Sequence, residues 1–258
     1  MDRARGGTGA VVLAGGRGTR LAPYTSVLPK PLMPIGNRAI LEIVVEQLVR
    51  SGIVDITLSV GYLSHLIRAV FENGIARHGA NIAYVHESKP LGTAGPLRLV
   101  EGLDDTFIVM NGDILTSLDY AELVDYHRRN GNAVTIATHR RTAKIDYGVL
   151  DSRATGTEGV RVTGYTEKPE LSMLVSMGIY VLEPHVVDLV PADEHFDFPD
   201  LVQALLAAGE PVGAFEYDGT WFDIGRREDY ERAVAVWDAD DGAEVGDVSA
   251  FPPAASAS

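Results

Sequence analysis

A glycine-rich turn, two arginines and a lysine between prolines form the segment of this chain that is best suited to chemistry. From residue 14 to residue 34 it reads AGGRGTRLAPYTSVLPKPLMP. Three glycines within residues 15–18 allow the backbone to approach a phosphate closely and to point its N–H groups inward. Arg17 and Arg20 present planar guanidinium groups whose geometry matches phosphate oxygens. The segment therefore predicts a site for a nucleoside triphosphate.

The letters of this turn differ from those of two common phosphate-binding loops. A dinucleotide fingerprint needs a third glycine or an alanine at the position of Leu21. A Walker loop needs Gly-Lys followed by Ser or Thr, and the sequence contains no Gly-Lys pair. The remaining alternative is a plain tight turn with solvated arginines. The ordered continuation through Thr19, Pro23 and Lys30 argues against it.

Two acidic residues are candidate metal ligands. Asp113 follows the apolar run 107–110, so its carboxylate is expected at the carboxyl edge of a parallel sheet, where α/β proteins bind ligands. Asp223 lies in a later loop, within WFDIG at 221–225. Two carboxylates from different loops, together with triphosphate oxygens and water, suit Mg²⁺. The alternative is that Asp113 caps a helix and Asp223 is a turn residue.

The elements that would position these residues alternate between strand and helix periodicity. The apolar run 10–14 before the glycine turn is typical of a strand buried on both faces. The alternation predicts βαβ units with right-handed crossovers. The elements expected in the first half are helix 40–49, strand 54–60, helix 62–72, strand 82–86, helix 93–101, strand 106–110 and helix 119–129. Those expected in the second half are strands 147–150, 160–165, 177–182 and 212–217 and helices near 198–208 and 226–237.

The order of the motifs resembles a known family. GGRGTRLAPYT followed by PKPLMPI is similar to the signature of the sugar-1-phosphate nucleotidyltransferases, also called NDP-sugar pyrophosphorylases. One motif such as NGD is weak evidence, but an ordered set that extends over about 210 residues is specific. The later landmarks are PLGTAG at 90–95, NGD at 111–113, YGV at 147–149, EKP at 167–169, GIY at 178–180 and WFDIG at 221–225.

The resemblance implies a reaction in which a sugar 1-phosphate attacks the α-phosphate of a nucleoside triphosphate in line, with Mg²⁺ bound and pyrophosphate lost. Such a nucleophile is already an anion, so the reaction needs alignment and charge neutralisation rather than a general base. The implied catalytic residues are Arg20, Lys30 and Asp113, and the implied metal ligands are Asp113 and Asp223. The implied nucleotide-binding residues are Ala14, Gly15, Gly16, Arg17, Gly18, Thr19, Glu87, Gly92 and Thr93. The implied sugar-phosphate-binding residues are Gly148, Glu167, Lys168 and Gly178.

Glu87 bears on the choice of base. It lies five residues before Gly92, where thymidylyl and uridylyl members of the family usually have glutamine. A carboxylate only accepts hydrogen bonds, which fits the two N–H donors of the guanine edge, whereas glutamine both donates and accepts. The order NGD, rather than GDN, also resembles the guanylyltransferase branch. We therefore expect GTP, with dTTP or UTP as the alternative.

The pattern and the resemblance imply the same fold. It is an α/β fold, Rossmann-like and three-layered (αβα), with a mostly parallel mixed central sheet and an inserted sugar-binding layer. We expect one domain over residues 1–237, with a nucleotide-binding part at about 9–140 and a sugar-binding part at about 141–237. Residues 238–258 have the composition of a flexible tail.

The amino-acid composition bears on which partners the protein can bind and on the cellular compartment in which it is expected. A formal net charge of −14 would repel nucleic acid and anionic membranes. No apolar run reaches the ~18 residues of a membrane span, and the absence of cysteine excludes disulfides and thiolate zinc sites. We expect a cytoplasmic protein that binds a nucleoside triphosphate and a sugar 1-phosphate. Because family relatives are often dimers or tetramers, a homo-oligomer is also compatible with the resemblance.

Two other functional classes stay open at this point. A glycosyltransferase of the related GT-A type would usually carry Asp-x-Asp after the central strand, where this chain has NGD. A catalytically inactive regulatory subunit would keep the fold and lose the charged residues. Those charges are all present in this chain, at Arg20, Lys30, Asp113, Lys168 and Asp223.

Overall fold

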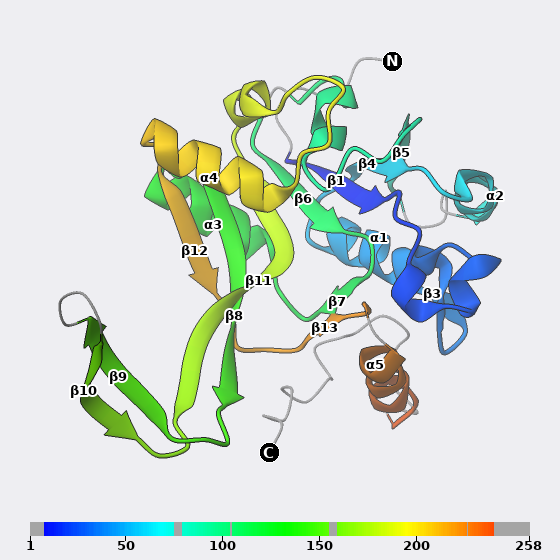
Figure 1. Ribbon diagram of the computed structural model, residues 1–258. Helices are drawn as coiled ribbons and strands as arrows, with labels where there is room; N and C mark the ends of the chain where they lie inside the picture. Colours follow the sequence, from blue (N-terminus) through cyan, green and yellow to red (C-terminus); the bar gives the residue numbers. More distant parts are fainter. Residues whose placement is uncertain (1–7, 75–78, 104, 155–158, 226, 240–258) are drawn as a thin grey trace.

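A seven-stranded mixed sheet with helices on both faces forms the centre of the computed structural model (Figure 1). The structure describes residues 8–74, 79–103, 105–154, 159–225 and 227–239. The strands lie in the order β12-β8-β11-β6-β1-β4-β5. Strand β11 is antiparallel to both of its neighbours, and the other pairs in the sheet are parallel. The expected α/β class with a mostly parallel mixed sheet is confirmed. The strands are β1 (Gly9–Ala14), β4 (Asp55–Val60), β5 (Asn81–His86), β6 (Phe107–Asn111), β8 (Val134–Lys144), β11 (Glu170–Leu182) and β12 (Val212–Glu216).

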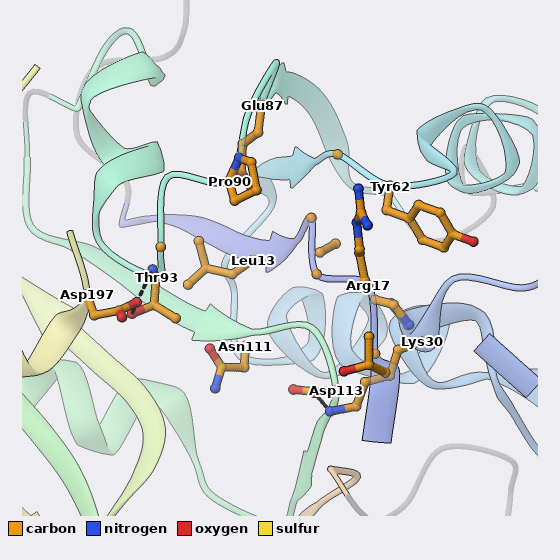
Figure 2. A pocket seen from close by; sticks show the side chains of 18 of the residues that line it. Leu13, Arg17, Lys30, Tyr62, Glu87, Pro90, Thr93, Asn111, Asp113 and Asp197 are labelled. Atoms are coloured by element: carbon orange, nitrogen blue, oxygen red, sulfur yellow. Dashed lines mark hydrogen bonds and ion pairs between the residues drawn. The ribbon is translucent and has the colours of Figure 1, made fainter. Parts of the chain in front are cut away.

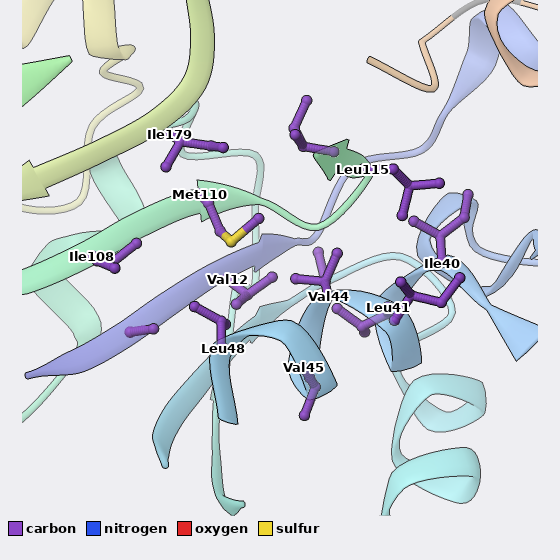
Figure 3. Packing of buried hydrophobic residues seen from close by; sticks show 14 of the residues in the cluster. Val12, Ile40, Leu41, Val44, Val45, Leu48, Ile108, Met110, Leu115 and Ile179 are labelled. Atoms are coloured by element: carbon purple, nitrogen blue, oxygen red, sulfur yellow. The ribbon is translucent and has the colours of Figure 1, made fainter. Parts of the chain in front are cut away.

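Strand β1 is buried on both faces, as its uninterrupted apolar sequence indicates. Val11 and Val12 are each 0% exposed, yet they belong to different core clusters, because successive side chains of a strand point to opposite faces. On the face of Val12, helix α1 (Ile40–Arg50) packs its apolar side against β1 and β6 (Figure 3). On the face of Val11, the packing helix is α4 (Phe198–Ala208). Two helical layers therefore cover β1, which lies between β6 and β4 in the sheet.

The other helices are α2 (Ser64–Gly74), α3 (Tyr120–Asn130) and α5 (Arg227–Ala239). Helix α3 begins where the Asp119 carboxylate accepts hydrogen bonds from two backbone N–H groups, and it ends at Gly131 with φ of 60°. Among the described residues, no helix has both the length and the apolar character needed to cross a membrane.

The segment expected as helix 93–101 is instead a short 3₁₀ turn, η5 (Gly95–Leu99). The helix prediction was wrong because the backbone at the start of this segment bonds to a distant carbonyl. The N–H groups of Ala94 and Gly95 both donate to the carbonyl of Phe196. Pro96 then allows a turn to begin without a donor of its own.

Two long strands extend beyond the main sheet and carry a hairpin. Strands β8 and β11 pair from Val134 opposite Leu182 out to Lys144 opposite Glu170. At their outer ends, β9 (Val149–Ala154) and β10 (Val160–Thr166) form a separate two-stranded hairpin that projects from the body (Figure 1). The inner parts of β11 and β12 belong to the central sheet. The division into a nucleotide-binding and a sugar-binding part stays a prediction, and residues 240–258 of the expected tail lie outside the described residues.

Candidate active site

A cleft of about 770 Å³ lies at the carboxyl ends of β1, β4, β5 and β6. Parallel strands bring their following loops to one edge of a sheet, where α/β folds bind ligands. All residues that the sequence assigned to nucleotide binding line this cleft, and so do the three assigned to catalysis (Figure 2). They are Ala14, Gly15, Gly16, Arg17, Gly18, Thr19, Glu87, Gly92 and Thr93, with Arg20, Lys30 and Asp113.

The loop after β1 is tightly packed at two of its glycines, Gly15 and Gly18. Gly18 has φ of 60°, and a Cβ there would lie 2.9 Å from Thr25 Cγ2 and 3.0 Å from Lys30 Cβ. The Thr25 hydroxyl donates to the carbonyl of Gly18 at 2.8 Å. A Cβ on Gly15 would overlap the carboxylate of Glu87. The loop therefore presents its backbone to the cleft and holds the Lys30 side chain beside it.

Lys30 and Asp113 form an ion pair across the floor of the cleft (Figure 2). The ammonium group contacts Asp113 Oδ2. The second carboxylate oxygen, Oδ1, is buried and has no hydrogen-bond partner within the described residues. A buried, unpartnered carboxylate oxygen is costly unless a cation or a donor joins it. This atom therefore favours a cation-binding role for Asp113.

Asp223 lies close to Asp113. The strand β13 (Trp221–Asp223) pairs with β7 (Ile114–Thr116), and the N–H of Ile224 donates to the Asp113 carbonyl at 3.1 Å. Desolvation and the neighbouring Asp113 carboxylate raise the pKa of Asp223, whereas the positive charges of Lys30 and Arg20 act in the opposite direction. Two carboxylates that repel each other fit a hard divalent cation.

The described residues contain no cluster of three or more His, Cys, Asp or Glu side chains that could hold a metal. A cation between two carboxylates would therefore need further oxygens from water or from a ligand. This arrangement is typical of Mg²⁺, which keeps several non-protein ligands and seldom uses an all-protein cage.

The arginines of the glycine loop are open to the cleft. Within the part of the chain that the structure describes, neither Arg17 nor Arg20 forms an ion pair. The Arg17 guanidinium lies 5.9 Å from the centre of the Tyr62 ring, and the Tyr62 hydroxyl donates to the Ser26 carbonyl at 3.1 Å. Both guanidinium groups are therefore available to phosphate oxygens.

Glu87 directly follows β5 and lies beside Gly15 of the glycine loop, where β4 fixes its carboxylate. The Ser59 hydroxyl donates to Glu87 Oε1 at 2.8 Å. Burial raises the pKa of Glu87, and hydrogen bonds from Ser59 and from the Leu91 backbone oppose that shift. The carboxylate is thus oriented by the protein before any ligand binds, with its side chain partly buried at the cleft.

None of the four residues assigned to the sugar phosphate lines the cleft, and three of them lie together. Gly148, Glu167 and Lys168 gather at the base of the hairpin, where the Tyr165 hydroxyl donates to Glu167 Oε2 at 2.5 Å. The Lys168 N–H donates to the Tyr147 carbonyl at 3.3 Å. Their role in binding stays a prediction.

The fourth, Gly178, lies in β11 with φ of 75°. A Cβ there would lie 2.6 Å from Nδ2 of Asn111, which does line the cleft. Gly178 therefore allows the close approach of β11 to the end of β6.

Several cleft residues were not identified from the sequence. Tyr62, Asn111, His195 and Asp197 all line the cleft. Asn111 follows the predicted strand 106–110 directly, and Tyr62 lies two residues after the predicted strand 54–60, so their position after those strands was an available signal. The segment of His195 and Asp197 lies about a hundred residues from the loop it contacts, as the Thr93–Asp197 separation of 104 shows. No local pattern places it at the cleft.

Residues 9–238 match the family model described as nucleotidyl transferase. The chain belongs to the nucleotidyl transferase family. The match covers the glycine loop, both candidate metal ligands and the hairpin, and it confirms the resemblance found in the sequence.

Curated relatives of this nucleotidyl transferase act on sugar phosphates. The chain described here is 36% identical over 237 residues to a mannose-1-phosphate guanyltransferase of Yarrowia lipolytica, with 88% of this chain and 63% of that one covered. It is 35% identical over 245 residues to a UTP–glucose-1-phosphate uridylyltransferase of Synechocystis, with 87% of this chain and 62% of that one covered. The chain therefore spans less than two thirds of the length of these relatives.

Solved structures agree on the fold. The crystal structure of HddC from Yersinia pseudotuberculosis in complex with GMP-PN has a TM-score of 0.66 and 26% identity, with 88% of this chain and 98% of that chain covered. A UDP-glucose pyrophosphorylase complexed with UDP-glucose has a TM-score of 0.68 at 20% identity, with 90% of this chain and 99% of that chain covered. This similarity shows the fold alone.

Proposed function

We propose that this nucleotidyl transferase moves a nucleoside monophosphate from a nucleoside triphosphate, preferentially GTP, to a sugar 1-phosphate and releases pyrophosphate. One observation carries the proposal. The Lys30–Asp113 ion pair, with one Asp113 oxygen unpartnered within the described residues, lies beside a glycine loop that bears two available arginines. A glycosyltransferase or an inactive regulatory subunit would not need this combination of groups.

The proposed mechanism relies on alignment and charge. Arg17, Arg20 and the backbone of the glycine loop hold the β- and γ-phosphates, which become the leaving pyrophosphate. Lys30, which lies beside the glycine loop, reaches toward the α-phosphate and stabilises the charge that develops there. Asp113 and Asp223 would hold Mg²⁺, which when bound neutralises phosphate charge. The sugar 1-phosphate supplies the attacking oxygen, so none of these side chains has to remove a proton.

The second substrate is proposed to contact the residues around the hairpin. Lys168 would bind the phosphate of the sugar 1-phosphate, and Glu167 would accept hydrogen bonds from sugar hydroxyls. Gly148 and Gly178 would leave room for the sugar ring. The names of the relatives support mannose 1-phosphate and glucose 1-phosphate as the first substrates to test.

A substrate panel tests the proposed function. Purified protein with Mg²⁺ is incubated with GTP, dTTP, UTP or ATP and with each of several sugar 1-phosphates, and pyrophosphate release is measured. We expect release only when both substrates are present, and fastest release with GTP. Transfer of the sugar from an NDP-sugar to an acceptor, with release of the nucleoside diphosphate, would instead indicate a glycosyltransferase. Binding of nucleotides without any turnover would indicate a regulatory subunit.

The preference for guanine is expected to depend on Glu87. The guanyltransferase relative and the GMP-PN complex support GTP, whereas the uridylyltransferase relative keeps UTP as the alternative. Replacing Glu87 with glutamine removes one acceptor that faces the two donors of guanine. We expect kcat/KM for GTP to fall by about 10- to 100-fold relative to dTTP and UTP, the scale of one charge-assisted hydrogen bond.

The control for this substitution is Glu46→Gln, which alters a carboxylate that binds Arg38 and Arg50. It should leave the ranking of the triphosphates unchanged. Equal use of dTTP and GTP by the wild type would overturn the role of Glu87 in base choice, while the phosphate and metal residues would keep their proposed roles.

A further inference from the structure

Asp197 binds the loop 87–95, here called the nucleotide loop, which packs on the same face of the central sheet as α4. Its Oδ1 accepts a hydrogen bond from the Thr93 backbone N–H at 2.8 Å and another from the Thr93 hydroxyl at 3.0 Å. The same hydroxyl accepts from the N–H of Phe198 at 2.9 Å. Figure 2 shows the two side chains together on one wall of the cleft. One carboxylate therefore fixes both the backbone and the side chain of Thr93.

Phe196, next to Asp197, binds the same loop through its backbone. Its carbonyl accepts from the N–H groups of Ala94 and Gly95, each at 2.9 Å, and its own N–H donates to the Leu91 carbonyl at 2.9 Å. The segment 196–198 is thus joined to the loop 91–95 by hydrogen bonds at several successive residues. A loop held in this way has little freedom to move relative to the start of α4.

Gly92 shows how close the two segments are. It has φ of 81°, and a Cβ there would lie 2.6 Å from the Phe196 carbonyl oxygen and 2.8 Å from Asp197 Oδ1. Gly92 also lines the cleft together with Glu87, Thr93 and Asp197. The wall that faces the nucleotide is therefore formed by two segments that are far apart in the sequence.

We propose that Asp197 is a positioning residue for nucleotide recognition. By holding Thr93, it sets the path of the loop 87–93 and so the placement of Glu87 and Gly92 against the base. The identity of the nucleotide, GTP, comes from the proposed function, and in this respect the role of Asp197 rests on that function. The proposal assigns Asp197 no contact with the reacting phosphates, whose proposed site is near Lys30 and Asp113, on the other side of the cleft from Asp197 (Figure 2).

The competing interpretation is that Asp197 only caps a helix. It is the N-cap of α4, and Asp200 Oδ2 accepts from the Asp197 N–H at 3.1 Å, which completes a capping box. Asp200 takes part in the same cap, and among the described contacts it makes none to Thr93. Substitution of Asp200 therefore weakens the cap without removing the bonds to the nucleotide loop, and it serves as the matched control.

The experiment compares Asp197→Ala, Asp197→Asn and Asp200→Ala with the wild type. The dissociation constant of GTP with Mg²⁺ is measured by titration calorimetry, and KM is measured for GTP and for the sugar 1-phosphate. For Asp197→Ala we expect GTP affinity to fall by about tenfold or more, the scale of losing a hydrogen bond to a charged group, with the KM of the sugar 1-phosphate little changed. Asp197→Asn should recover most of the affinity, because its amide oxygen can accept both bonds.

Asp200→Ala should lower the melting temperature and leave GTP affinity near that of the wild type. Equal GTP affinity for Asp197→Ala and Asp200→Ala would overturn the positioning role, as would an equal rise in both KM values. If the wild type binds GTP but turns over none of the substrate pairs, the proposed function fails. A loss of GTP affinity confined to Asp197→Ala would still support the positioning role in that case.

Discussion

Replacing Lys30 with alanine is expected to lower kcat by about 100-fold or more while changing the KM for the triphosphate far less, because a preorganised charge counts most in the transition state. Lys30 is held between the glycine loop and Asp113, with its Cβ close to Gly18 and its ammonium on the carboxylate. It can therefore face the α-phosphate without a large rearrangement. Steady-state kinetics with both substrates varied separates kcat from the two KM values.

Lys144→Ala is the control for this experiment. Lys144 pairs with Glu170 at 3.2 Å on the exposed part of β8, and such surface pairs contribute little to stability. We expect kinetics close to those of the wild type. A Lys30→Ala enzyme with an unchanged kcat and a raised KM would make Lys30 a residue for substrate binding alone.

Asp113→Asn is expected to abolish turnover and to leave the fold intact. The substitution keeps the size of the side chain but removes the charge that pairs with Lys30 and the anionic oxygen Oδ1 that has no partner among the described residues. Without that charge the site loses affinity for a hard cation. Turnover is measured with saturating Mg²⁺, and circular dichroism and the melting temperature report the fold.

The same substitution at Asp119 provides the matched control. Asp119 caps α3, and asparagine is an equally good residue at a helix N-cap, so Asp119→Asn should keep both stability and turnover. The wild type should also lose turnover in excess EDTA and regain it when Mg²⁺ is added. Undiminished wild-type turnover in excess EDTA would contradict the proposed metal requirement.

The helices and strands that could be predicted are those whose own apolar pattern indicates which of their faces are buried. Strand β1 is apolar on both faces, and helix α1 repeats its apolar positions at helical spacing, so both lie within a residue or two of the predicted ranges. The outer half of β8 reads RRTAK and is exposed, so no apolar pattern indicates a strand. It is a strand because β11 pairs with it. Pairing with a distant partner is not visible in a local window of sequence.

The residues of the candidate site also fall into those that could be predicted from the sequence and those that could not. The glycine loop, Lys30 and Asp113 lie in short motifs, and the structure brings them to one cleft. The closeness of Asp223 to Asp113 depends on the pairing of β7 with β13, which joins distant parts of the chain and is not visible in a local window of sequence. His195 and Asp197 had no signal at all, since their place at the cleft depends on hydrogen bonds to Thr93 and its neighbours.

The cleft is lined by residues from Leu13 to Gly225, so segments near both ends of the described chain contribute to one binding surface. A fragment that lacks either end of this range cannot form the cleft, and nucleotide binding is linked to folding of the complete domain. A ligand that binds only the folded chain stabilises it by about 2.7 kcal/mol at a concentration 100 times its dissociation constant. Nucleotides can therefore be ranked by the protection they give against unfolding and proteolysis, even when no second substrate is known.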